Sequence, residues 1–148
     1  MKRTFVFGGL LMLLSVAAQA QEIKVHNFIG KAITEVSAFY GKPVHQDNSN
    51  PDMVCTFYRL PNRNYTFVSD AKGVYQANAT ITYNTKDESK KAIDVFLKDC
   101  LSNDYTVDTI STEKYKLRRQ GNKMELNLSP IANSENFQII IEAKKSDD

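Results

Sequence analysis

IGKAITEVSAFYGKP, residues 29–43, is the first stretch of this chain with the pattern of a folded helix. Gly41 suits the left-handed residue that commonly ends a helix, and Pro43 prevents the helix from continuing. The later segments are expected to be strands that pack against this helix and one more. The apolar residues of the stretch recur at steps of three and four and so share one side of a helix: Ile29, Ile33, Val36 and Tyr40.

Residues 1–20 have the features of a secretory signal peptide. Lys2 and Arg3 give a positive start, residues 5–14 are an apolar run, and residues 18–20 read Ala-Gln-Ala, a cleavage signature. The apolar run is well short of the roughly 20 residues that span a bilayer. We therefore expect cleavage after Ala20 and a periplasmic or secreted protein. Residues 21–148 would then form a single α+β domain with no integral membrane span.

The apparent basicity of the chain comes from this leader. The whole chain has 19 Lys and Arg against 17 Asp and Glu, and without Lys2 and Arg3 the two counts are equal at 17. A neutral mature chain does not favour nucleic acid or anionic membranes as partners.

Cys55 and Cys100 are the two cysteines of the chain. In an oxidising compartment the default expectation for such a pair is a disulfide. Closing a loop of this length would stabilise the fold by roughly 4 kcal/mol in the chain-entropy model. Unpaired buried thiols and a catalytic thiol are the weaker alternatives.

Alternation of apolar and polar residues predicts three strands after the first helix, at 53–60, 65–69 and 74–83. On the first of these strands, Cys55 and Tyr58 lie on opposite faces. If Cys55 faces the interior, the disulfide would join this strand to the second helix. Tyr58 would then point outward.

The second helix begins with a capping box, because Thr85 and Glu88 stand three residues apart. Its apolar stripe places Cys100 on the buried side. The stripe consists of Ile93, Phe96, Leu97, Cys100 and Leu101.

Four more strands are expected at 105–110, 114–119, 123–129 and 137–143, with Gly121-Asn122 as a two-residue hairpin turn. That turn would place Leu117 opposite Leu126, facing inward, and Arg118 opposite Glu125, facing outward. The element order is α-βββ-α-ββββ. Both helices are predicted to pack on one face of an antiparallel sheet, which could be a degenerate tandem repeat of about 60 residues.

The first half resembles the small lipoproteins of the outer-membrane β-barrel assembly machine and the related β-lactamase-inhibitor-protein fold. Residues 55–58 resemble the aromatic strand of that module, and residues 67–74 resemble its second strand and glycine turn. The resemblance implies a non-enzymatic protein-binding role, although the lipid-attachment cysteine is missing here. The helix residues that carry it are Gly30, Val36, Tyr40, Gly41 and Pro43.

No set of residues predicts catalysis, a metal site or a cofactor. His26 and His45 lack ligand spacing and neighbouring carboxylates, and no phosphate loop or nucleophile elbow is present. The three Asn-X-Ser/Thr sequons would matter in a eukaryotic secretory pathway, whereas the leader looks bacterial. The sequons begin at Asn64, Asn78 and Asn127.

Two surface features could contact a partner. Tyr58 is the first choice, as an aromatic anchor on an outward strand face. The second is a basic strip of Lys114, Lys116 and Arg118, which could instead be a solvated strand whose charges discourage edge pairing. We therefore expect a non-enzymatic binding module of the bacterial cell envelope, either an assembly accessory or a proteinaceous inhibitor. A periplasmic carrier of a small ligand or lipid is the alternative.

Overall fold

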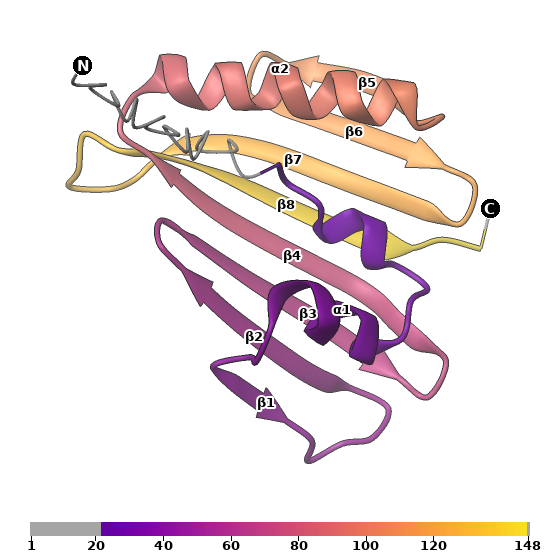
Figure 1. Ribbon diagram of the computed structural model, residues 1–148. Coiled ribbons are helices and arrows are strands. Elements are labelled where there is room, and N and C mark those ends of the chain that lie inside the picture. Colours follow the sequence, from indigo (N-terminus) through magenta and orange to yellow (C-terminus); the bar gives the residue numbers. More distant parts are fainter. Residues whose placement is uncertain (1–21, 148) are drawn as a thin grey trace, which may run out of the picture.

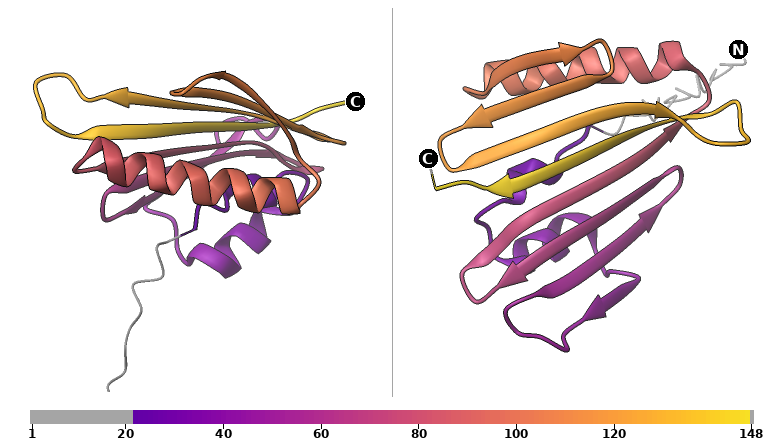
Figure 2. Two further views of the ribbon diagram at one scale, coloured as in Figure 1. Left: turned by 90° about the horizontal axis from the view of Figure 1, so that it is seen from above. Right: turned by 180° about the vertical axis from the view of Figure 1, so that it is seen from behind.

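The computed structural model describes residues 22–147, so the predicted leader and its cleavage site lie outside the described residues. Helices and strands are arranged in two layers, with the helices on one face of a single sheet (Figures 1 and 2). The helical elements are η1 (Val25–Phe28), α1 (Ile33–Tyr40) and α2 (Lys86–Ser102). The strands are β1 (His45–Asp47), β2 (Val54–Leu60), β3 (Arg63–Asp70), β4 (Gly73–Tyr83), β5 (Thr106–Ser111), β6 (Lys114–Arg119), β7 (Asn122–Pro130) and β8 (Phe137–Lys145).

The sheet has eight strands in the order β1-β2-β3-β4-β8-β7-β6-β5, and every neighbouring pair is antiparallel. The predicted α+β fold with both helices on one face of an antiparallel sheet is confirmed. One element was missed: the polar stretch after α1, predicted to be a loop, contains the short edge strand β1. Each half is therefore a helix followed by four strands, and the halves join where β4 pairs with β8.

Helix α1 has a capping interaction at its start and a glycine that ends it. The Glu35 carboxylate accepts a hydrogen bond from the Ala32 N–H at 3.0 Å, and Gly41 ends the helix with a φ of 84°. Val36 is fully buried, whereas Ile29 follows η1 and lies outside the helix. At Gly73, where φ is 121°, an added Cβ would lie 2.7 Å from the Lys31 carbonyl oxygen. Only glycine allows this close approach between β4 and the segment before α1.

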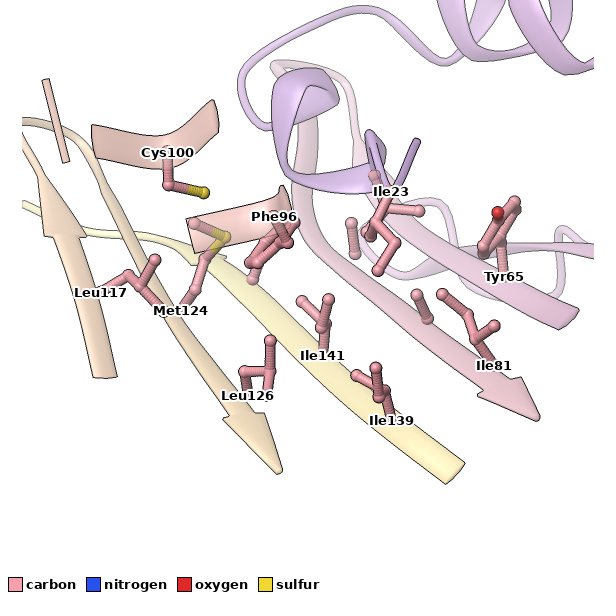
Figure 3. Packing of buried hydrophobic residues seen from close by; sticks show 14 of the residues in the cluster. Ile23, Tyr65, Ile81, Phe96, Cys100, Leu117, Met124, Leu126, Ile139 and Ile141 are labelled. Atoms are coloured by element: carbon pink, nitrogen blue, oxygen red, sulfur yellow. The ribbon is translucent and has the colours of Figure 1, made fainter. Parts of the chain in front are cut away.

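Helix α2 begins as predicted, because the Thr85 hydroxyl accepts a hydrogen bond from the Glu88 N–H at 3.1 Å. The predicted apolar stripe of this helix wrongly included Leu101, which is 59% exposed. The fully or nearly fully buried residues of the helix are Ser89, Ile93, Phe96 and Cys100. They pack over the half of the sheet that contains Leu117, Met124, Leu126 and Ile141 (Figure 3).

The core lies between the helices and the sheet face that they cover. His26 of η1 is part of it, at 1% exposure, with its ring edge-on to Phe96 and Tyr105. Its carbonyl oxygen accepts a hydrogen bond from the Asn122 side chain at 3.1 Å. This contact ties the amino-terminal segment to the start of β7, 96 residues away in the chain.

The predicted disulfide is wrong, because both cysteines are free. On β2, Thr56 and Tyr58 face the helices and are buried, so Cys55 points to the opposite side of the sheet. Cys100 is buried beneath α2 over the other half of the sheet (Figure 3). The sheet itself therefore separates the two thiols.

The predicted register of the β6–β7 hairpin is also wrong. Arg119 pairs with Asn122, so Gln120 and Gly121 form the turn, and Arg118 lies opposite Lys123 rather than Glu125. A shift of two residues leaves every side chain on its predicted face, because the side-chain period of a strand is two. It changes which charges are neighbours across the strands.

Candidate functional site: the open face of the sheet

The face of the sheet opposite the helices is called here the open face, because no helix of residues 22–147 covers it (Figure 2). Strands are about 4.8 Å apart and residues along a strand about 3.4 Å apart, so eight strands make a surface roughly 34 Å wide. A depth of six residues gives an area of roughly 700 Å². That is the same order as the roughly 800 Å² that each partner contributes to a standard protein–protein interface.

Tyr58 does not lie on the open face, and its predicted role as an outward anchor is wrong. It is 3% exposed on the helix side of the sheet. Its hydroxyl donates a hydrogen bond to the Gly41 carbonyl oxygen at 3.0 Å and lies 3.4 Å from the Ser37 hydroxyl. The side chain therefore fastens the end of α1 to β2.

The aromatic side chain that β2 presents on the open face is Phe57, whose ring is stacked on that of His45 with a centroid distance of 5.7 Å. The registers place Phe57 opposite Thr66 of β3, and Thr66 opposite Asn78 of β4. This half of the open face is mostly uncharged. A sequence signal for Phe57 existed, since it shares a face with Cys55; choosing the wrong face for Cys55 concealed it.

The predicted basic strip of Lys114, Lys116 and Arg118 does lie on the open face, on β6. The structure adds two cations from the next two strands of the sheet. Lys123 of β7 is opposite Arg118, and Lys144 of β8 is opposite Lys123. Lys144 lies beyond the last strand predicted from the sequence, which ended at residue 143, but β8 extends to Lys145.

Two carboxylates lie beside these cations. Glu125 of β7 is opposite both Lys116 and Glu142 of β8. The Glu125 carboxylate is 3.8 Å from the Lys116 ammonium and 4.0 Å from that of Lys114. A hollow of about 250 Å³ lies on the open face, and its charged lining residues are Lys116, Arg118, Lys123, Glu125, Glu142 and Lys144. Four of these charged side chains are cations and two are carboxylates, so the hollow is predominantly cationic.

A second hollow lies on the helix side. It has a volume of about 300 Å³ and lies between α2, the start of the described chain and the ends of β3 and β4. Val95, which is 58% exposed, and Phe96 contribute from α2, and Tyr83 contributes from β4. Arg63 also borders it, and its guanidinium donates a hydrogen bond to the Tyr65 hydroxyl at 3.1 Å. We call this hollow the helix-side groove.

The two histidines differ in burial, because His26 is buried and His45 is exposed. Burial lowers the pKa of His26 to about 4, with a smaller contribution from the positive charges of Arg119 and Lys24. His45 is exposed on β1. Among residues 22–147, no group of three or more His, Cys, Asp or Glu side chains is placed to hold a metal ion. No helix in the same range is long and apolar enough to cross a membrane.

Comparison with known families adds little to this geometry. No family model matches the chain, and no curated protein matches its sequence. The resemblance to the assembly lipoproteins and the inhibitor fold therefore stays a prediction.

Two solved structures show a distant likeness. A cysteine-rich secretory protein from Staphylococcus aureus subsp. aureus Mu50 is 8% identical, with a TM-score of 0.46 over 80% of this chain. An extracellular protein containing an SCP domain from Bacillus anthracis str. Ames is 12% identical, with a TM-score of 0.42 over 86% of this chain. The match spans 45% and 47% of the length of those two proteins. Likenesses at this level carry no argument about function.

Proposed function

We propose that this chain is a non-enzymatic protein-binding module of the bacterial cell envelope that contacts its partner through the open face. The observation that carries the proposal is the open face itself, a broad surface of eight paired strands that no helix within residues 22–147 covers. A rigid sheet presents its side chains in fixed positions, which lowers the entropy lost on binding. The leader pattern of residues 1–20 supports a location in the periplasm or outside the cell.

The side chains of the open face suit a protein partner better than a small molecule. Phe57 and His45 supply aromatic contact area at one side, and the cationic hollow supplies charge at the other. Aromatic and arginine side chains are the residues that most often dominate the energy of protein interfaces. The surface extends over eight strands, whereas a small-ligand site encloses most of its ligand.

The experiment is a crosslinking pull-down from the native envelope with a variant that blocks the centre of the open face. Thr66→Arg/Thr80→Arg adds two bulky charges on β3 and β4, where both side chains are half-buried on the open face. Thr112→Arg makes one such substitution in the exposed β5–β6 turn and serves as the control. We expect the double variant to lose a protein that both wild type and Thr112→Arg recover. Recovery of the same protein by all three would contradict the proposal.

The helix-side groove supports a second candidate function, a carrier of a small apolar ligand or lipid. Its volume of about 300 Å³ falls at the lower end of the range for ligand pockets, which is about 300 to 1,000 Å³. Ala92→Phe would fill the groove from α2, where Ala92 borders it. A lipid or metabolite that co-purifies stoichiometrically with wild type, and is lost in Ala92→Phe, would support the carrier and contradict the binding module.

A further inference from the structure

Three cations form a straight row across three strands of the open face. Arg118 is the direct neighbour of Lys123 across β6 and β7, and Lys123 is the direct neighbour of Lys144 across β7 and β8. All three side chains are exposed. Since adjacent strands are about 4.8 Å apart, the row presents three positive charges within about 10 Å. We call it the cationic row.

The row is unfavourable for the isolated fold, because like charges directly opposite each other destabilise a sheet. Lys144 pairs with Glu142 on its own strand. Within residues 22–147, no ion pair joins Arg118 or Lys123 to a carboxylate. Among the described residues, these two adjacent positive charges therefore have no carboxylate partner.

Protection of a sheet edge does not explain the row. Charged side chains often prevent the unpaired edge of a sheet from joining another sheet. β6, β7 and β8 are all interior strands, paired on both sides, and the edges of the sheet are β1 and β5. An explanation other than edge protection is needed for all three charges.

Two residues further along the strands the charges change sign. Glu125 and Glu142 lie opposite each other next to the cationic row, and Asp108 lies opposite Lys116 in the same second row. The two rows are about 7 Å apart. A uniform polyanion that covered the cationic row would also lie close to these carboxylates. A protein surface, in contrast, can place carboxylates over the cationic row and hydrogen-bond donors over Glu125 and Glu142.

We propose that the cationic row binds the carboxylates of an acidic segment on a protein partner. The proposal rests on the proposed function and adds the chemistry of the partner. Arg118 can hold a carboxylate through two parallel hydrogen bonds, and Lys123 and Lys144 add point charges beside it. Charge complementarity of this kind also speeds encounter, so association should be sensitive to salt.

The test measures binding of a defined acidic probe to the purified exported protein. The probe is a fluorescein-labelled peptide of five alternating Glu-Ser units, with the Gln-Ser peptide as its neutral counterpart. Lys123→Gln removes the centre of the row without breaking an ion pair with any carboxylate in the described part of the chain. Lys98→Gln removes the same charge from an exposed site on α2, on the other side of the sheet, and is the matched control.

We expect the Glu-Ser peptide to bind, the Gln-Ser peptide not to bind, and 0.5 M salt to abolish binding. Lys123→Gln should raise Kd about two- to five-fold, as expected for loss of one exposed ion pair, and Lys98→Gln should leave it unchanged. Glu125→Gln, which removes a negative charge beside the row, should lower Kd. Equal binding by Lys123→Gln and wild type would overturn the proposal.

Two further outcomes distinguish a failure of the acidic-partner inference from a failure of the proposed function. If inorganic polyphosphate displaces the peptide and binds more tightly through Lys123, the row serves a phosphate polyanion and the proposal is overturned. If no acidic peptide binds while Thr66→Arg/Thr80→Arg still abolishes capture of an envelope protein, the acidic-partner inference fails and the proposed function stands. If the acidic peptide does not bind and the pull-down shows no loss in Thr66→Arg/Thr80→Arg, both the acidic-partner inference and the proposed function are refuted.

Discussion

Arg118 of β6 and Lys123 of β7 lie directly opposite each other on the open face, so two positive charges are neighbours in a sheet where an opposite pair would be more stable. A cost of this kind in the free protein is expected at a surface selected for binding rather than for stability. The charge contact can be tested by measuring stability.

Lys123→Gln should make the free protein more stable. Removal of the repulsion from Arg118 and Lys144 should raise the free energy of unfolding by about 0.5 kcal/mol at low salt. The gain should shrink in 1 M NaCl, where charges are screened beyond about 3 Å. Urea unfolding at two salt concentrations measures both effects. Lys98→Gln, on α2, should show little change, and a loss of stability in Lys123→Gln would contradict the account.

Tyr58→Phe should destabilise the protein by about 1 kcal/mol, the typical net value of one buried hydrogen bond. The variant keeps the ring and removes the hydroxyl that binds the Gly41 carbonyl oxygen. Tyr75→Phe removes a comparable bond, from the Tyr75 hydroxyl to the Asp52 carbonyl oxygen, at a more exposed site, and should cost less. Chemical denaturation compares the two. A neutral Tyr58→Phe would show that Tyr58 does not fasten α1 to the sheet.

The thiols should be free and unequal in reactivity. Cys100 has no exposed surface, and burial raises the pKa of its thiol to about 12, so it should not react in the native protein. Cys55 is half-buried on the open face and should react first. Maleimide labelling without a reductant should modify one thiol in native protein and two after unfolding. No labelling after unfolding would show a disulfide.

The protein should begin to lose stability as the pH drops below about 6.5, before ordinary carboxylates start to titrate. The pKa of His26 is about 4 in the folded protein, against 6.5 for an ordinary histidine. Between these values the unfolded chain binds more protons than the folded one, so the contribution of neutral His26 is complete above about pH 6.5 and is lost as the pH falls to about 4. The loss should reach roughly 3 kcal/mol.

Urea unfolding at pH 4.5, 5.5 and 7 checks this loss. His26→Phe keeps an aromatic ring between Phe96 and Tyr105. In this variant the free energy of unfolding should change less between pH 5 and 7 than in wild type. His45→Gln, at an exposed site on β1, should leave the pH dependence unchanged. An unchanged slope in His26→Phe would show that another group is responsible.

The fold could be predicted from the sequence because local signals agreed with one another. Gly41 does end α1, Thr85 does cap α2, and the alternation in residues 74–83 does assign Ala77 and Ala79 to the buried face. These signals depend on neighbours in the chain. They do not fix the register of a hairpin or the face of a strand whose two sides are equally apolar.

One ambiguous strand accounts for the two wrong site predictions. On β2, both faces carry an apolar or aromatic residue, and the choice of Cys55 as the inward residue required Tyr58 to point outward. The hydrogen bond from the Tyr58 hydroxyl to the Gly41 carbonyl oxygen shows that Tyr58 faces the helices and Cys55 the open face. A two-residue error in the β6–β7 turn likewise hid the cationic row, since the row exists only when Arg118 meets Lys123.

The central claim is that the open face binds a protein partner, and site-specific photocrosslinking in living cells tests it most directly. A benzophenone amino acid is placed at Thr80, on β4 at the centre of the open face, or at Asp94, exposed on α2. We predict a discrete crosslinked protein from Thr80 and none from Asp94, with the Thr80 product lost in the presence of Thr66→Arg. Crosslinking from Asp94 alone, or equally from both positions, would contradict the claim.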